Sequence, residues 1–249
     1  MDNILELKNV SLTYHTLIDE IIAVKDFSFT AKKGEFVSII GPSGCGKTTI
    51  LSMIAGLITP TKGEILINGK KERANNLGYM LQKDQLFPWR TIEKNLYLPL
   101  EIKKRLTKEN RDYVSSLLDK YGLSSFRNSY PDQLSGGMRQ RAALIRTLSF
   151  KPDVMLLDEP FSALDSQTRL SVSDDVFKIL KKEEKTAILV THDISEAIAM
   201  SDVIVVLTER PATVKTIIKP NLVGETPIER RKCQNFGILF DKIWKELNV

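Results

Sequence analysis

Residues 35–49 read EFVSIIGPSGCGKTT, and this stretch decides the fold. Residues 35–40 form a short apolar run of strand length, and residues 47–57 have the pattern of a helix. Between them, residues 41–48 match G-x-x-x-x-G-K-[ST], a glycine-rich turn from a buried strand into a helix. Glycine lets a phosphate approach the backbone because no Cβ intervenes, and the N–H groups at a helix start face the anion. The stretch therefore predicts an α/β fold with a phosphate-binding loop.

Individual residues of this loop have expected parts in binding a nucleotide. The Lys47 ammonium would reach the β- and γ-phosphates, and the Thr48 hydroxyl would ligate Mg²⁺. Cys45 would contribute mainly through its backbone, and a redox role is the weaker alternative. The expected nucleotide-binding residues of the loop are Gly41, Pro42, Ser43, Gly44, Cys45, Gly46, Lys47, Thr48 and Thr49.

Strand-like segments elsewhere in the chain suggest two β elements. Residues 4–14 and 21–30 predict strands of an antiparallel element. Short apolar runs follow at residues 154–157, 186–191 and 203–207, each next to helical patterning. Such alternation of strand and helix predicts a mostly parallel core sheet.

The stretch from residue 82 to residue 134 has a different character. Prolines punctuate it, and residues 93–102 and 108–121 combine helical periodicity with many charges. A further helix is predicted at residues 141–150. We interpret this stretch as a helical insertion.

The end of the chain predicts one more strand and one more helix. The strand is expected at residues 214–218. The helix is expected to pack its apolar face onto its own domain. That face would carry Phe236, Phe240, Ile243, Trp244 and Leu247.

Composition limits the classes of protein that remain. The 249 residues are 42% hydrophobic and 27% charged, which is typical of a globular protein, and the net charge is only +5. The longest apolar runs, such as residues 203–207, are far shorter than a membrane helix, and the first residues do not resemble a secretory signal. Cys45 and Cys233 are too few for a disulfide framework. The basic runs at 103–105 and 230–232 favour solvated faces over a nucleic-acid surface, so no nucleic-acid partner is expected and a cytosolic chain is the default.

Residues 154–160, VMLLDEP, place two acids at the end of an apolar strand. Open α/β sheets bind ligands at the carboxyl edge of their strands. Asp158 would hold Mg²⁺, through water, and Glu159 would orient and polarise an attacking water. This pattern is weak alone, and the phosphate-binding loop makes it strong.

Residues 134–140, LSGGMRQ, complete a set of motifs. At this point the sequence resembles the ATP-binding cassette family of transport ATPases, from residue 14 to about residue 207. Residues 41–48 look like its Walker A motif, residues 154–159 like Walker B and residues 134–140 like its signature. Met138 stands where many members carry Gln, which is expected to have little effect.

The resemblance implies roles for further residues. Gln82 matches the Q-loop and would bond to the Mg²⁺ shell or to the attacking water, and His192 would contact the γ-phosphate. Tyr14 matches the aromatic that stacks on adenine, with core packing as its alternative and His15 as a nearby competitor. The remaining residues implied to contact nucleotide are Ser135, Gly136 and Gly137, which would cap the partner subunit's ATP, and Asp165, which would position partner residues.

The resemblance also implies an architecture and an assembly. The chain would be a single cassette domain over residues 1–249, with a RecA-like core at about 1–85 and 150–210, a helical subdomain at about 86–149 and a C-terminal extension at about 211–249. It would bind ATP and Mg²⁺ and pair with a second copy or a paralogous cassette. Its other partners would be transmembrane permease subunits and, indirectly, an extracytoplasmic solute-binding protein, which places it peripherally on the cytoplasmic side of the membrane.

Two shorter segments are similar to the importers of nitrate, sulfonate and taurine. These are residues 82–90, QKDQLFPWR, and residues 209–211, ERP. Phe87 and Trp89 would line the groove for a permease helix, or would pack inside the helical subdomain. The solute could be a sulfonate, nitrate, taurine or a vitamin precursor.

Three other functions are alternatives to the importer. An exporter ATPase is the nearest. A cassette ATPase acting on DNA or ribosomes would need long coiled coils or a second cassette, and this sequence has neither. A regulator that binds nucleotide without hydrolysis is disfavoured by the intact Glu159 and His192.

Overall fold

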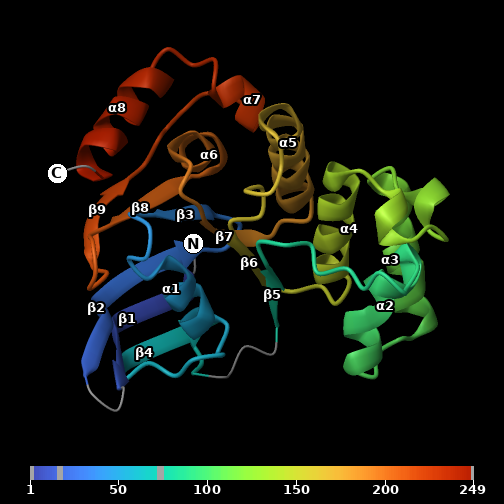
Figure 1. Cartoon of the computed structure of the whole chain (residues 1–249), viewed down its shortest axis with the longest axis horizontal. Coiled ribbons are helices and arrows are strands. Elements are labelled where there is room, and N and C mark those ends of the chain that lie inside the picture. Colours follow the sequence, from blue (N-terminus) through green and yellow to red (C-terminus); the bar gives the residue numbers. More distant parts are fainter. Residues whose placement is uncertain (1–2, 16–18, 72–75, 248–249) are drawn as a thin grey trace.

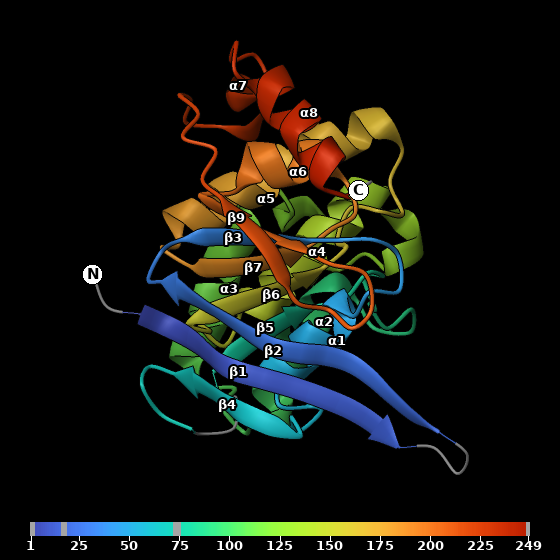
Figure 2. The same cartoon turned by 90° about the vertical axis from the view of Figure 1, so that its left-hand side faces the viewer.

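The computed structural model describes residues 3–15, 19–71 and 76–247, which contain two β-sheets (Figures 1 and 2). The larger sheet has the strand order β5-β6-β7-β3-β8-β9, and the smaller has the order β2-β1-β4. The strands of the larger sheet are β3 (Phe36–Ile40), β5 (Leu77–Met80), β6 (Val154–Asp158), β7 (Thr186–Val190), β8 (Val203–Leu207) and β9 (Val214–Ile218). Those of the smaller sheet are β1 (Asn3–His15), β2 (Glu20–Lys32) and β4 (Lys62–Ile67).

The larger sheet confirms the predicted parallel core. Strands β5, β6, β7, β3 and β8 run parallel, and β9 joins the edge antiparallel to β8. Every residue of β3, β6, β7 and β8 is buried. A parallel strand covered on both faces needs such a continuous apolar run, which is why these strands were visible in the sequence.

The smaller sheet confirms the predicted antiparallel element, in which β1 pairs with β2 and β4. The sequence analysis missed β4 and β5. Strand β4 has no fully buried residue, and β5 has only four residues, so neither has a distinct hydrophobic pattern.

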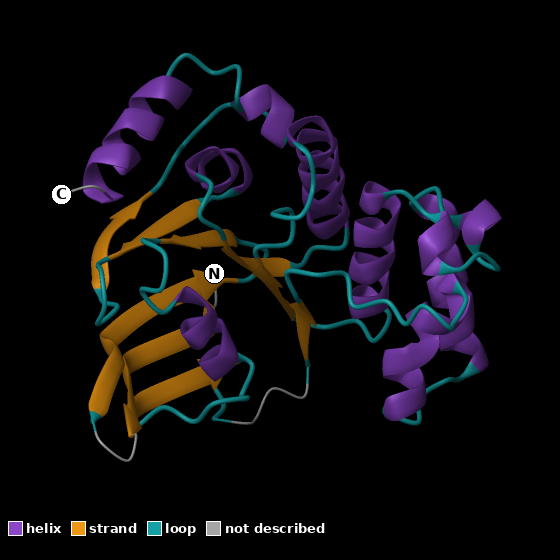
Figure 3. Ribbon diagram, in the orientation of Figure 1, coloured by secondary structure: helices purple, strands orange, loops and turns teal. Residues whose placement is uncertain are grey.

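Helices fill the space between the sheets and cover the outer face of the larger one (Figure 3). Helix α1 packs between the two sheets, where Ile50 and Leu51 join one core with Leu5 of β1 and Val37 of β3. The opposite face of the larger sheet packs against α4 and α5. The helices are α1 (Lys47–Ile54), α2 (Ile92–Ile102), α3 (Lys108–Lys120), α4 (Gly136–Leu148), α5 (Ser166–Lys182), α6 (Ile194–Met200), α7 (Pro227–Arg230) and α8 (Phe236–Leu247).

Two predicted helices have different boundaries in the structure. Helix α1 ends at Ile54 rather than at residue 57, because Gly56 adopts φ 71° and its N–H turns back to the Met53 carbonyl at 3.0 Å. Helix α4 begins at Gly136 rather than at residue 141 and ends at Leu148. Its start is earlier because the Ser135 hydroxyl accepts a hydrogen bond from the Met138 N–H at 3.3 Å and caps the helix.

Helices α2 and α3 lie at a distance from both sheets, with α4 between them and α5 (Figure 1). The predicted helices at 93–102 and 108–121 correspond to them within one residue. Buried Leu96, Val114 and Leu117 join the same core as α4. The domain boundaries given above stay predictions, and residues 1 and 249 lie outside the described residues.

The C-terminal segment packs back over α5 and α6, as Figure 1 shows. In α8, Ile243 is fully buried and Phe236, Phe240 and Leu247 pack partly against the core. Trp244 is 54% exposed and stacks on Phe240, so its predicted place on the packed face is wrong.

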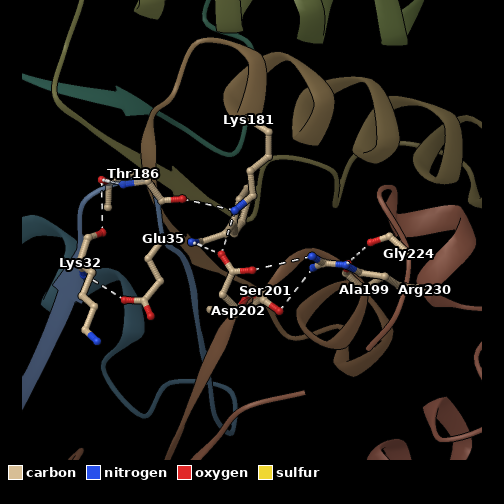
Figure 4. A network of polar contacts seen from close by, with 12 residues as sticks. Lys32, Glu35, Lys181, Thr186, Ala199, Ser201, Asp202, Gly224 and Arg230 are labelled. Atoms are coloured by element: carbon tan, nitrogen blue, oxygen red, sulfur yellow. Dashed lines mark hydrogen bonds and ion pairs between the residues drawn. The ribbon is translucent and has the colours of Figure 1, made fainter. Parts of the chain in front are cut away.

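A polar network also attaches this segment (Figure 4). The Arg230 guanidinium donates to the Ala199 carbonyl at 3.3 Å and lies 3.7 Å from the Asp202 carboxylate. Asp202 in turn accepts from the Phe36 N–H and the Lys181 ammonium, both at 2.9 Å. The C-terminal segment is thus tied to strand β3 and helix α5.

In the three ranges for which the structure gives positions, no helix combines the length and the apolar character needed to cross a membrane.

Candidate nucleotide-binding site

The phosphate-binding loop joins β3 to α1, as predicted. Gly44 and Gly46 adopt φ 71° and 123°, which a side chain would strain. A Cβ at Gly46 would also lie 3.1 Å from the Ala23 carbonyl oxygen. Gly46 is the N-cap of α1 and offers no capping side chain. The first N–H groups of the helix therefore remain available to an anion.

The Lys47 side chain lies back across this loop. Its ammonium donates to the carbonyls of Gly41 at 2.8 Å and Pro42 at 2.9 Å, and the residue is buried. Gly41 makes this compact turn possible, because a Cβ there would lie 2.9 Å from the Leu207 Cβ. The positively charged Lys47 ammonium thus lies directly beside the N–H groups of the loop.

Asp158 lies at the end of β6, next to the start of α1. Its carboxylate accepts hydrogen bonds from the Thr48 hydroxyl and the Tyr79 hydroxyl, both at 3.2 Å. Burial raises the pKa of Asp158, and the two hydrogen bonds oppose that rise. Burial and the neighbouring Asp158 together raise the pKa of Tyr79 to about 12, so this tyrosine keeps its proton at neutral pH and donates a hydrogen bond to Asp158.

Glu159 follows directly and adopts φ 46°, a conformation unusual for a residue with a side chain. Its N–H donates to the Val190 carbonyl at 2.9 Å, and its carboxylate lies 3.2 Å from the Nδ1 of His192. The structure therefore brings together Glu159 and His192, which the sequence separates by about thirty positions.

Gln82 reaches the same region indirectly. Its amide donates to the Ser162 hydroxyl at 3.1 Å, and that hydroxyl donates to the Glu159 carbonyl at 2.9 Å. Gln82 contacts Ser162 and not Thr48 or Asp158 among the described residues, so its predicted metal-binding role stays a prediction.

A cavity of about 570 Å³ opens in front of the loop. Tyr14 and His15 at the end of β1 line it, and so does Glu159. Tyr14 is 41% exposed, which rules out core packing as its alternative role. The lining residues are Tyr14, His15, Ile21, Ala23, Ser43, Gly44, Gly46, Lys47, Thr48, Thr49, Glu159 and Arg210. A hollow with an aromatic at one end, a phosphate-binding loop and a carboxylate suits a nucleoside triphosphate.

The remaining predicted residues do not line this cavity. Ser135 caps α4, and Gly136 and Gly137 form the first turn of that helix. Asp165 caps α5 by accepting from the N–H groups of Gln167 and Thr168, and hydrogen bonds at Thr168 hold the pKa of its carboxyl below its usual value. These residues lie at two further helix N-termini, those of α4 and α5, separate from the loop.

Three residues of the site have roles that the sequence analysis did not identify. Tyr79 contacts Asp158, Ser162 connects Gln82 to Glu159, and Arg210 donates to the Gly44 carbonyl at 3.1 Å while lining the cavity. The contacts of Tyr79 with Asp158, of Ser162 with Gln82 and of Arg210 with Gly44 join positions far apart in the chain. Only Arg210 had a local signal, because it lies in the ERP segment.

The donor set at Thr48 and Asp158 suits Mg²⁺. Both groups are oxygen ligands, and they face one another across 3.2 Å at the start of a helix that can hold phosphate. Across residues 3–15, 19–71 and 76–247, no three His, Cys, Asp or Glu side chains gather as a metal site of their own.

Comparison with known proteins gives a consistent assignment. The sequence profile of a family described as "ABC transporter" matches residues 24–162. The ABC transporter ATP-binding protein YtlC of Bacillus subtilis (strain 168) is 51% identical over 248 residues, which covers 98% of this chain and 95% of YtlC. The aliphatic sulfonates import ATP-binding protein SsuB of Bacillus thuringiensis subsp. konkukian (strain 97-27) is 38% identical over 87% of this chain and 86% of SsuB.

A solved structure is similar as well. It is the ATP-binding cassette MJ0796 as a dimer in a post-hydrolysis state bound to ADP and Pi. The TM-score is 0.74 at 35% sequence identity, and the match covers 88% of this chain and all of that one.

Proposed function

Because the chain belongs to the ABC transporter family, we propose that it is the ATP-hydrolysing subunit of an importer for a small solute such as a sulfonate, taurine or nitrate. As a member of this family, it binds and hydrolyses ATP. One observation carries the assignment of the site. The loop lysine, the Thr48–Asp158 pair and the Glu159–His192 pair meet around the carboxyl edge of the larger sheet.

In our proposal, each of these residues has a part in hydrolysis. The N–H groups of the loop and the Lys47 ammonium hold the β- and γ-phosphates and stabilise the charge that develops on them. Glu159 accepts a proton from, or orients, the water that attacks the γ-phosphate, and His192 holds the Glu159 carboxylate through its ring nitrogen. Tyr14 stacks on the base at the open end of the cavity.

Thr48 and Asp158 would hold Mg²⁺ beside these phosphates. When bound, the ion supplies positive charge at the β- and γ-oxygens. Tyr79 keeps the Asp158 carboxylate oriented toward Thr48 by donating to its other oxygen.

The separation of the two helix N-termini supports action as a dimer. The loop at α1 and the Ser135–Gly136–Gly137 turn at α4 both present N–H groups, but only the first lines the cavity. In our proposal a second copy, or a paralogous cassette, brings its α4 turn against the nucleotide held by this chain. The dimeric state of MJ0796 bound to ADP and Pi supports this arrangement.

An exposed aromatic pair is our proposed contact with the membrane subunit. Phe87 and Trp89 stack at 4.9 Å, and Trp89 is 72% exposed, so packing inside the helical insertion does not describe it. The fully buried Asn95 fixes the backbone beneath the pair. Its amide accepts from the Phe87 N–H at 2.7 Å and donates to the carbonyls of Phe87, Arg90 and Thr91.

This pair is connected to the nucleotide site by the segment that starts at Gln82. The Arg146 guanidinium on α4 donates to the carbonyls of Asp84 at 2.7 Å and Gln85 at 2.6 Å. Arg139 on the same helix pairs with the Asp84 carboxylate at 3.1 Å. Helix α4 therefore carries both the Ser135 turn and the segment that leads to the aromatic pair. A movement of α4 on nucleotide binding would be transmitted to Trp89.

The catalytic assignment is tested with Glu159→Gln. We expect the variant to bind ATP as the wild type does, to lose hydrolysis by about 100-fold or more, and to accumulate as an ATP-bound dimer. Steady-state hydrolysis, ATP titration and light scattering of the purified chain measure these three properties. Hydrolysis near the wild-type rate would exclude Glu159 as the principal catalytic carboxylate.

The importer assignment is tested by uptake and by co-purification. We expect a strain whose only copy of this protein carries Lys47→Ala to lose uptake of an alkanesulfonate, of taurine or of nitrate. We expect the tagged wild-type chain to co-purify with a polytopic membrane protein. Trp89→Ala should lose this co-purification while keeping hydrolysis by the isolated chain, whereas Ile238→Ala, an equally exposed apolar side chain on α8, should keep both. Recovery of ribosomes or DNA instead would contradict transport.

A further inference from the structure

Arg169, on the first turns of α5, joins two loops that lead into the nucleotide site. One guanidinium nitrogen donates to the Leu164 carbonyl at 3.0 Å. Another lies 3.7 Å from the Asp193 carboxylate. Leu164 ends the loop that begins with Glu159, and Asp193 directly follows His192. The Arg169 side chain thus connects the loop that follows Glu159 to the residue that follows His192.

The same two loops also meet at the site itself. The His192 ring nitrogen and the Glu159 carboxylate are 3.2 Å apart. Together with the Arg169 contacts, this closes a ring that runs from Glu159 along the loop to Leu164, across Arg169 to Asp193, and back through His192. Arg169 is thus placed to influence the position of His192 against Glu159.

Both ends of the connection are firmly held. Asp193 caps α6 by accepting from the Glu196 N–H at 3.1 Å, and the buried Thr191 hydroxyl donates to the Glu196 carboxylate at 2.7 Å. At the other end, the Leu164 N–H donates to the Phe161 carbonyl at 3.1 Å. A displacement of Arg169 is thus passed to short, rigid loops rather than absorbed by them.

Charges from three elements surround the connection. Asp193 and Glu196 contribute carboxylates from the start of α6, and Arg231 contributes a second guanidinium from the C-terminal segment. Burial raises the pKa of Glu196 and lowers the pKa of Arg231, and the Asp193 and Glu196 carboxylates oppose the lowering at Arg231. Of the charged groups named here, Arg169 is the one that contacts both loops within the described part of the chain.

We propose that Arg169 is a positioning residue for ATP hydrolysis, which sets the geometry of Glu159 and His192 by tying their two loops together. Among the described residues, Arg169 does not line the cavity, so we expect its substitution to change turnover rather than nucleotide binding. The proposal rests on the catalytic assignment of Glu159 and His192 made above.

A double-mutant cycle on the purified chain tests the connection. Arg169→Gln removes the bridge, and Asp193→Asn removes its charge while an Asn can still cap α6. We expect each variant to lower kcat by about 10-fold, since small misplacements of catalytic groups carry penalties of this size or larger, and to keep the ATP dissociation constant within about 2-fold. The double variant should be no slower than the slower single variant, because both break one connection.

Arg127→Gln is the matched control. Arg127 also donates to an uncharged oxygen, that of Ser115 at 2.8 Å, and lies 3.6 Å from a carboxylate, that of Glu93, but it belongs to the helical insertion. We expect it to keep the wild-type kcat. Equal losses in Arg127→Gln and Arg169→Gln would overturn the proposal.

Three further outcomes would also overturn it: a wild-type kcat in Arg169→Gln, multiplied losses in the double variant, or an ATP affinity that falls as much as kcat. If Arg169→Gln does not fold, Asp193→Asn decides alone through the split between kcat and affinity. Glu159→Gln, measured in parallel, distinguishes a failure of the catalytic assignment from a failure of the proposal for Arg169. Retained hydrolysis there rejects the catalytic assignment, whereas its loss beside an unaffected Arg169→Gln rejects only the role of Arg169.

Discussion

Asp158 illustrates how one carboxylate is kept ionisable at the end of an apolar strand. The strand that delivers it is fully buried, and burial raises its pKa. Hydrogen bonds from Thr48 and Tyr79 favour the charged form and offset part of that effect. The Tyr79 hydroxyl is the hydrogen-bond partner of Asp158 that the sequence motifs do not reveal.

Tyr79→Phe should therefore destabilise the protein and raise the pKa of Asp158 further. We expect the free energy of unfolding at pH 7 to fall by about 1–3 kcal/mol, the usual cost of leaving a buried acceptor without its donor. Urea unfolding measures it. Tyr97→Phe is the control, because Tyr97 donates at the same 3.2 Å to Glu93, which also has Arg127 nearby. An equal loss in both variants would contradict a special role for Tyr79.

The residues that the sequence predicts are those whose chemistry lies within one continuous motif. Lys47 and Thr48 are specified by the loop, and Asp158 and Glu159 by the apolar strand before them. Tyr79 was missed because its partner lies 79 positions away and a tyrosine in a short strand looks like packing. Arg210 was missed because its partner Gly44 lies 166 positions away, and Arg169 because an arginine in the first turn of a helix does not reveal which loops it contacts.

At the scale of elements, helix α4 packs so closely on α5 that glycine is needed at its first turn. A Cβ at Gly137 would lie 2.8 Å from the Val172 Cγ2 on α5. A Cβ at Gly136 would lie 3.1 Å from the Leu164 side chain. The two glycines thus set the distance between the helices as well as presenting N–H groups.

Gly137→Ala should cost about 1–3 kcal/mol of unfolding free energy, because one added methyl group overpacks the α4–α5 contact. Gly237→Ala is the matched change near the start of α8, where nothing lies within 4 Å of the added Cβ. It should be neutral or stabilising by up to about 1 kcal/mol, since alanine favours helix. Thermal unfolding of both variants without nucleotide checks the difference. Similar losses would show that the packing argument is wrong.

Glu183, at the end of α5, links that helix to α3. Tyr121 donates to its carboxylate at 2.8 Å and Tyr113 at 3.3 Å, and Lys120 pairs with it. Burial acts to raise the pKa of Glu183, but these partners outweigh burial and hold the pKa below its usual 4.5. The charged form is therefore more stable in the folded protein than in the unfolded chain.

Glu183→Gln should lower the unfolding free energy by about 1.5–3 kcal/mol at pH 7. A lowered folded-state pKa contributes stability above the unfolded-state pKa and loses it as the pH falls through the folded value. The difference between wild type and variant should thus be full at pH 7 and shrink as the pH falls below about 4.5. Urea unfolding at pH 7 and near pH 4 measures it. A stability difference that grows on acidification would show that the pKa of Glu183 is not lowered by folding.

Elements were predictable where their pattern is long or fully apolar, and unpredictable where tertiary contacts define them. The buried strands and helices α2 and α3 follow the sequence pattern closely. The start of α4 depends on the Ser135 cap, and β4 and β5 are held by their neighbours rather than by their own pattern. Trp244 fits a helical stripe in sequence, yet α8 turns it outward.

For the whole molecule, the network around Asp202 attaches the C-terminal segment to the sheet and to α5 (Figure 4). Arg230 is largely buried, donates to the Gly224 carbonyl at 3.2 Å within its own segment, and packs over the Phe177 ring. It joins the segment to the nucleotide-binding body by polar contacts, beside the apolar packing of α8.

Arg230→Met should keep the fold and loosen this segment. We expect a loss of about 1.5–3 kcal/mol of unfolding free energy, the range for hydrogen bonds that involve a charge, and faster proteolytic cleavage between residues 219 and 235. Limited proteolysis followed by mass spectrometry locates the cut. Lys242→Gln, an exposed change on α8, should leave the cleavage rate unchanged. Unchanged cleavage in Arg230→Met would show that apolar packing of α8 suffices.

The strand order has a consequence for how the chain is made. Strand β3, which leads into the phosphate-binding loop, has β7 and β8 as its two neighbours in the sheet. During synthesis it is the first strand of that sheet to leave the ribosome, yet its first neighbour begins at Thr186 and its second at Val203. The strand that carries the loop therefore stays without native partners through most of translation. The nascent chain must keep this apolar segment from pairing elsewhere until the last third of the protein has emerged.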